Sequence, residues 1–273
     1  MEIQWALVLF TVISGAGAWL FACSMLASLF KKDEAPNKAE TVASFVLVAV
    51  GGCMSVMHLS HVDRILEALN HPTSGIFVEA AMIGVLCVIL AVYFVLLVRG
   101  SSEKARTVVG VLALCVGVVF TYLCGSSYLM EARPAWMSVA LPLAYFGTAA
   151  SAGAGLNLFM KAVQKREGTA MSFSGLLAVI GGALGAVLAA AFCITAGSYL
   201  AEAQNGAIVW AVALFVAVVA VIACGVLAMK QPKNALAWGA IALVAGVVAA
   251  IALRAAMWLV GSPFMNFFLV ALD

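Results

Sequence analysis

The sequence predicts an all-α integral membrane protein, a single domain over residues 1–273 that crosses the bilayer eight times. Hydrophobic residues make up 66% of the chain, charged residues only 10%, and the mean hydropathy is +1.15. Apolar runs recur at about 20 residues, the length at which a helix crosses the hydrocarbon core. These runs are continuous, whereas membrane β-strands need about 10 residues of alternating polarity. All the spans are therefore expected to be α-helices.

The eight expected spans follow from the eight apolar runs in chain order. The first run follows a leader that carries Glu2 and no Lys or Arg, and it exceeds the apolar core of a signal peptide, about 7 to 15 residues. We therefore interpret it as a retained helix. The expected spans are Trp5 to Phe30, Thr41 to Leu59, Ile76 to Val98, Thr107 to Tyr128, Trp136 to Met160, Ser172 to Ala201, Ala207 to Ala228, and Leu236 to Val260.

Lys and Arg are distributed unevenly between the connections, and this distribution predicts the orientation. The connections after the first, third, fifth and seventh spans hold eleven Lys and Arg, whereas the remaining connections hold only Arg64 and Arg133. Short cytoplasmic connections carry the excess of basic residues in membrane proteins. The four basic connections are thus expected in the cytoplasm, with both termini outside.

Three ionisable residues lie inside or at the edge of the spans: His58, Glu79 and Arg254. A charge in hydrocarbon costs roughly 2.5 to 3.5 kcal/mol on insertion scales, so a retained one usually faces a partner, a ligand or internal water. At about 1.5 Å per residue, all three lie roughly 26 to 29 Å from the cytoplasmic boundary. That level is just inside the outer boundary of a core about 30 Å thick. The shared level predicts a functional site there.

Each of these residues also has a purely structural interpretation. Arg254 can extend its charge to the lipid headgroups, His58 can be a solvated residue at a helix end, and Glu79 can favour the dipole of the first helical turn. Three charge types at one depth favour a functional site over three separate structural roles.

The connection between the second and third spans contains His58 and continues to Glu79. Apolar residues within 65–69 recur at helical spacing, which predicts a short interfacial helix ended by the helix breakers Pro72 and Gly75. Such a helix would cover the level of His58.

Several residues spread over the chain together carry a resemblance to a known family. They are His58-Leu59, Arg64 six residues later, Leu69-Asn70, Glu79 opening the next span, Pro134-Ala135-Trp136-Met137-Ser138 before the fifth span, and Arg254 in an aromatic-containing last helix. In these features the sequence resembles the membrane-anchor subunit of DMSO reductase, the DmsC type. The resemblance covers the whole chain in length, span count and orientation.

The resemblance implies an eight-helix anchor in the bacterial cytoplasmic (inner) membrane, acting in anaerobic respiration with a menaquinol site near the periplasmic face. It implies two partners on the outer face, an iron–sulfur subunit that receives electrons and a molybdopterin catalytic subunit, and both cofactors are expected only there. His58, Arg64 and Glu79 match residues that the family uses for menaquinol. Besides these subunits, membrane lipid is an expected partner and nucleic acid is not.

The chemistry of quinol oxidation assigns roles to the polar residues. The reaction releases two electrons and two protons, and histidine, with an unperturbed pKa of about 6.5, accepts protons near neutral pH. His58 is expected to be the catalytic proton acceptor, and Glu79 to relay the proton or orient the imidazole. Arg254 is expected to balance the carboxylate. Trp258 either stacks on the quinone ring or anchors its helix at the interface, and we favour the anchor.

Other residue types predict no metal or haem site. The seven cysteines lie singly within the spans without a C-x-x-C pair, so neither a cluster nor a disulfide framework is expected. His58, His61 and His71 all lie between the second and third spans, so no pair on separate helices is available to ligate haem. Small residues such as Gly147 and Gly155 are expected to let helices approach closely.

Two rival functions belong to different classes. In a secondary transporter, Glu79 and Arg254 would form a proton relay or substrate pair, but transporters tend to contain internal repeats and broken helices near the midplane. Here the polar residues lie near one face and the sequence shows no repeat. The other rival is an anchor or assembly subunit without a redox role.

Overall fold

The computed structural model describes residues 2–57, 70, 74–203 and 206–261, and within them the regular structure is entirely helical. Eight long helices match the eight expected spans in order, with ends that shift by a few residues. The elements are α1 (Trp5–Leu29), α2 (Lys38–Val56), α3 (Gly75–Val98), α4 (Glu103–Ser126), η2 (Pro134–Trp136), α5 (Ala140–Val163), α6 (Gly168–Thr195), α7 (Gly197–Glu202), α8 (Ala207–Lys230), η3 (Pro232–Asn234) and α9 (Ala235–Val260).

The all-α membrane class is confirmed, although one long helix differs from the rest. Among the described residues, 7 helices are long and apolar enough to cross a membrane. The long helix outside this set is α5, whose 24 residues are rich in Ala, Gly, Ser and Thr. It is as long as α3 and α4 and lies among other helices, in contact with α1, α4, α6 and α9. The eighth crossing therefore stays a prediction.

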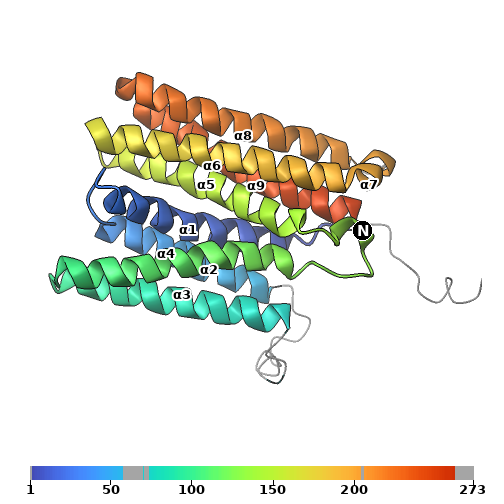
Figure 1. Ribbon diagram of the computed structural model, residues 1–273, viewed down its shortest axis with the longest axis horizontal. Coiled ribbons are helices and arrows are strands. Elements are labelled where there is room, and N and C mark those ends of the chain that lie inside the picture. Colours follow the sequence, from blue (N-terminus) through green and yellow to red (C-terminus); the bar gives the residue numbers. More distant parts are fainter. Residues whose placement is uncertain (1, 58–69, 71–73, 204–205, 262–273) are drawn as a thin grey trace, which may run out of the picture.

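The eight long helices form two four-helix bundles with the same connectivity (Figure 1). In the first bundle α1, α2, α3 and α4 each pack against the next, and α4 packs back against α1. In the second, α5, α6, α8 and α9 repeat this ring, and α1 and α4 pack against α5 between the bundles. The duplication is one of architecture, because the sequence shows no matching repeat.

The two ends of the molecule differ in charge. The connections 30–37, 99–102, 164–167 and 231–234 lie together at one end, on the left in Figure 1, and we call this the basic end. The connections after α2, α4 and α6 lie at the opposite end. The grouping of the basic connections is as expected from the sequence, whereas the side of the membrane on which they lie stays a prediction.

Thiol labelling of intact cells tests that orientation. In Lys165→Cys the new thiol is expected to resist a membrane-impermeant reagent until the cells are opened, whereas in Glu131→Cys it is expected to react at once. Lys230→Cys, at the same end as Lys165, is a matched control that should behave like it. The reverse pattern would overturn both the orientation and an outer-face site.

Small residues allow α5 to pack closely inside the molecule. A side-chain carbon on Gly153 would collide with the backbone of Trp19 in α1, and one on Gly155 would collide with the backbone of Ala242 in α9. Gly147 faces the backbone of α6 in the same way, at Leu184. The expectation that these glycines serve close helix approach is confirmed.

All seven cysteines are free of disulfide bonds, as expected from the sequence.

Candidate functional site

The predicted site residues divide into those that the structure describes and those that it does not. Glu79 lies near the start of α3, and Arg254 and Trp258 lie one turn apart near the end of α9. Both locations belong to the end opposite the basic end (Figure 1). His58, Arg64 and the expected interfacial helix lie outside the described residues. Glu79 and Arg254 thus lie toward the same end of the molecule, and their depth in the membrane stays a prediction.

Arg254 is buried in the interior of the molecule, with 1% of its surface exposed. Its Nε donates to Thr11 Oγ1 of α1 at 2.6 Å, and its Nη1 donates to Thr148 Oγ1 of α5 at 3.2 Å and to the Ala250 carbonyl at 2.9 Å. The guanidinium also lies over the Tyr145 ring, 4.2 Å from its centroid. An arginine that extends to the headgroups would be exposed, so this structural interpretation of Arg254 is wrong.

The two threonines are oriented to accept these hydrogen bonds. The Thr11 hydroxyl donates to the Leu7 carbonyl at 3.1 Å, and the Thr148 hydroxyl donates to the Ala144 carbonyl at 2.9 Å. A hydroxyl has one proton, so each oxygen is left with lone pairs for the guanidinium. Helices α1, α5 and α9 therefore fix Arg254 in one position, at the boundary between the two bundles.

Four aromatic side chains surround this position. Trp136 and Trp258 pack edge to face at 5.2 Å between centroids, and Tyr128 packs against both and against Tyr145, which lies at 5.6 Å. Trp136 Nε1 donates to the Met257 carbonyl at 2.8 Å. We call Tyr128, Trp136, Tyr145 and Trp258 the aromatic cluster.

Trp258 belongs to the interior of this cluster and not to a lipid-facing surface. Only 6% of its surface is exposed, and no described residue accepts a hydrogen bond from its indole nitrogen. A tryptophan that anchors a helix at the interface presents its ring to the headgroup region. Our preference for the anchor is therefore wrong, because Trp258 is buried and packs against the rings of Trp136 in η2 and Tyr128, just after α4.

Glu79 reaches the same region from the first bundle. A side-chain hydrogen bond links it to Ser127, just after α4, and both Glu79 and Arg254 interact electrostatically with the Tyr128 hydroxyl. Among the described residues no carboxylate lies within ion-pair distance of Arg254. The ion pair between Glu79 and Arg254 that we expected is therefore not formed. The two residues act instead on the same hydroxyl, that of Tyr128.

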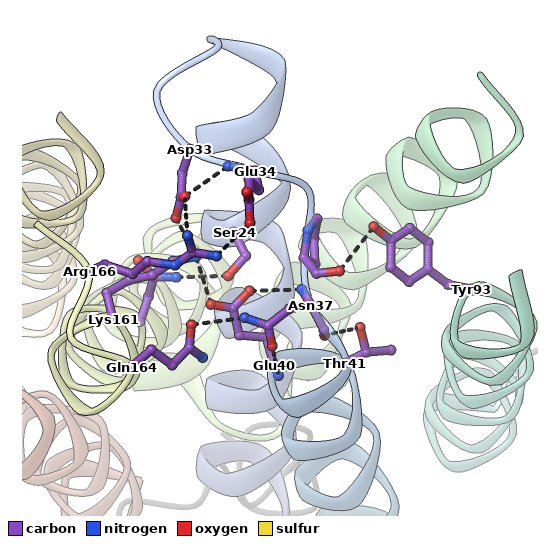
Figure 2. Close-up of polar contacts among 12 residues, drawn as sticks. Ser24, Asp33, Glu34, Asn37, Glu40, Thr41, Tyr93, Lys161, Gln164 and Arg166 are labelled. Carbon is purple, nitrogen blue, oxygen red and sulfur yellow. Dashed lines mark hydrogen bonds and ion pairs between the residues drawn. The ribbon is translucent and has the colours of Figure 1, made fainter. Parts of the chain in front are cut away.

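A second cluster of charges, which sequence reasoning missed, lies at the basic end (Figure 2). Lys161 of α5 has 1% of its side chain exposed, and its Nζ lies 2.6 Å from Asp33 Oδ2 and 2.7 Å from Glu40 Oε1. We call these three residues the buried triad. The sequence predicts that the fifth span ends at Met160 and that Lys161 belongs to the following connection. In the structure α5 continues to Val163, so Lys161 is helical and its side chain is buried.

Neighbouring polar residues extend the triad across the boundary between the bundles. Glu40 also forms a capping box with Asn37 at the start of α2, and Asn37 Nδ2 donates to Gln164 Oε1 at 2.8 Å. Arg166 Nη2 donates a hydrogen bond to Glu34 Oε2 at 2.7 Å, and this hydrogen bond raises the pKa of Arg166. The capping pattern Asn-x-x-Glu was a signal in the sequence for the start of α2, but nothing in it indicated a buried lysine partner.

The described residues offer proton-accepting and hydrogen-bonding chemistry at the opposite end. Among them, no group of three His, Cys, Asp or Glu side chains is placed to hold a metal ion. Glu79 can accept a proton, and Arg254 and Trp258 present N–H donors within an aromatic environment that suits a flat ring. Whether haem is bound stays a prediction, because all three histidines lie outside the described residues.

Comparison with known proteins gives two matches. A family model described as the DMSO reductase anchor subunit (DmsC) matches residues 1–236. The anaerobic dimethyl sulfoxide reductase chain YnfH of Escherichia coli (strain K12) is 26% identical over 155 residues, 55% of each chain. The chain thus spans about half the length of this curated relative in the match. Glu79 lies within the region that the family model matches, and Arg254 and Trp258 lie beyond it.

Proposed function

We propose, because the chain belongs to the family of DMSO reductase anchor subunits (DmsC), that it oxidises menaquinol near the outer face of the bacterial cytoplasmic membrane. It anchors a molybdoenzyme complex of anaerobic respiration there and passes electrons to an iron–sulfur partner subunit, which supplies the molybdopterin catalytic subunit. The observation that carries this proposal is the location of Glu79, the buried Arg254 and the aromatic cluster toward the end opposite the basic end, with Arg254 over the Tyr145 ring of that cluster.

The residues divide the reaction between proton transfer and binding. Menaquinol loses two protons and two electrons to become menaquinone. His58 takes the first proton, and Glu79 receives it from the imidazole or accepts the second. Arg64, Arg254 and Trp258 bind the headgroup. The electrons leave on the outer face, since the chain is expected to hold no haem that would carry them across the bilayer.

Replacing Glu79 by glutamine tests this proposal. Gln keeps the shape and the hydrogen bond to Ser127 but cannot accept a proton, so we expect quinol-driven turnover to fall about 100-fold, the lower part of the range for a general base. Turnover from a soluble artificial electron donor should be unchanged, because it bypasses the quinol. Both rates are measured on the purified complex.

Glu131→Gln is the matched control, since Glu131 is an exposed carboxylate in the connection after α4. It should leave both rates unchanged. Equal quinol-driven rates in Glu79→Gln and the unmodified complex would remove Glu79 from the mechanism.

One observation favours the transporter alternative. The two bundles share their connectivity, and many transporters are built from two structural repeats. Purification in mild detergent separates the possibilities: iron–sulfur and molybdenum subunits are expected to accompany the anchor, whereas a transporter would be isolated without them. An anchor without a redox role would retain these subunits and show no quinol-driven turnover.

A further inference from the structure

Arg254 has hydrogen-bond donors for which the described residues offer no acceptor. A guanidinium carries five N–H groups. Three of them are directed to Thr11, Thr148 and the Ala250 carbonyl, from Nε and Nη1. No described residue accepts a hydrogen bond from Nη2, although Arg254 is buried.

Among the described residues, Arg254 also has no counter-charge. Its acceptors are two hydroxyls, one carbonyl and the face of the Tyr145 ring, and all of these are neutral. The guanidinium stays protonated in proteins. A buried charge without an opposite charge is strongly unfavourable, and such residues usually mark a ligand or ion site. Within the part of the chain that the structure describes, Arg254 therefore lacks both an opposite charge and acceptors for all of its donors.

Trp258 supplies a second unused donor one helical turn away. Its buried Nε1 has no acceptor among the residues that the structure describes. The buried indoles of Trp19 and Trp136, in contrast, donate to Thr121 Oγ1 at 3.2 Å and to the Met257 carbonyl at 2.8 Å. Residues four apart lie on the same face of a helix, so both unused donors belong to one face of α9. Two such donors beside the aromatic cluster indicate a site for an oxygen atom.

We propose, on the basis of the quinol-oxidising function proposed above, that Arg254 Nη2 and Trp258 Nε1 bind menaquinol in its singly deprotonated form. Menaquinol first gives one hydroxyl proton to the proton acceptor of the proposed function, which leaves an anionic oxygen. Arg254 supplies the missing opposite charge, and both donors bind this oxygen. The anion then loses its second proton and two electrons, which pass to the iron–sulfur partner, and becomes menaquinone.

This arrangement favours the reactive species over both substrate and product. A charge-assisted hydrogen bond is about twice as strong as one between neutral groups, so Arg254 binds the anion more tightly than neutral menaquinol or menaquinone. It therefore promotes the first deprotonation. It also lets the neutral quinone leave after the electrons have gone.

Binding of two matched naphthoquinones to the purified complex tests the proposal. A 2-hydroxy-3-alkyl-1,4-naphthoquinone is an anion at neutral pH, and its 2-methoxy ether is neutral and of similar shape. We expect the unmodified complex to bind the anion at least about 10-fold more tightly than the ether. In Arg254→Gln the Kd of the anion should rise about 10- to 100-fold, with the Kd of the ether changed by less than about 3-fold.

Two further variants keep the test decisive if Arg254→Gln does not assemble. Trp258→Phe removes the unused donor and keeps an aromatic ring, so the anion should bind about 5-fold more weakly. Trp19→Phe is the matched control, because its indole N–H already has an acceptor within the protein, and the preference for the anion should persist. Assembly is monitored by co-elution with the partner subunits.

The outcomes separate this proposal from the function on which it rests. If Arg254→Gln, or Trp258→Phe where the first does not assemble, binds the anion as tightly as the unmodified complex, the anion site is overturned while quinol oxidation stands. If the unmodified complex binds neither compound and shows no quinol-driven turnover, the proposed function fails and this inference fails with it.

Discussion

Replacing His58 by alanine is expected to abolish turnover driven by a menaquinol analogue while the complex still assembles. Alanine removes the group that takes the first proton, and loss of a general base lowers a rate by about 100- to 10,000-fold. Reduction of the terminal substrate from a soluble artificial donor should continue, because that route does not involve the quinol. Both rates are measured on the same preparation.

His71→Ala is the matched control for this experiment. His71 lies in the same connection between α2 and α3 but is not among the residues that carry the family resemblance. It should therefore retain quinol-driven turnover. Full quinol-driven activity in an assembled His58→Ala complex would remove His58 from the mechanism and overturn the quinol site as proposed here.

Replacing Lys161 by methionine is expected to have the largest effect on stability. Methionine fills a similar volume but removes the positive charge that lies 2.6 Å from Asp33 and 2.7 Å from Glu40. Asp33 then keeps only Arg166, at 3.9 Å, and the buried Glu40 keeps no ion-pair partner among the described residues. Removing one member of a buried ion pair costs about 3 to 5 kcal/mol. Thermal denaturation in detergent, monitored by labelling of buried thiols such as Cys23, should show a clearly lower midpoint.

Two further variants separate the loss of the pair from the loss of a lysine in general. Lys230→Met removes an exposed lysine near the same end and should leave the midpoint unchanged. The triple variant Lys161→Met/Asp33→Asn/Glu40→Gln replaces the two carboxylates by neutral amides. Gln at position 40 can still form the capping box of α2. Much of the lost stability should return, because a neutral replacement of a buried ion pair is often tolerated. Equal midpoints for Lys161→Met and the unmodified chain would show that the buried triad does not stabilise the fold.

The apolar length of each segment predicted the helices well, because about 20 continuous apolar residues suit a bilayer helix and few other structures. The eight runs correspond to the eight long helices, and the basic connections gather at one end. The two-bundle arrangement was not predictable in this way. Which helices pack together depends on the shapes of facing surfaces, which hydropathy does not describe.

The candidate site was predictable in position but not in detail. Helical rise placed Glu79 and Arg254 at one level, and the structure brings both near Tyr128. The rise does not specify which way a side chain faces. It therefore did not indicate that Arg254 binds Thr11 and Thr148, or that Trp258 packs against other rings.

The composition of α5 has a consequence for how the chain enters the membrane during synthesis. Its small and hydroxyl-bearing residues gain little from contact with lipid, and its end carries the buried Lys161. The insertion machinery favours segments by their own transfer free energy, on which such a helix is a weak candidate. The predicted crossing by α5 therefore depends on neighbours that cover it, above all α1, which is made before it, and α6 and α9, which are made after it. Biogenesis of this protein thus couples the integration of one segment to the folding of those around it.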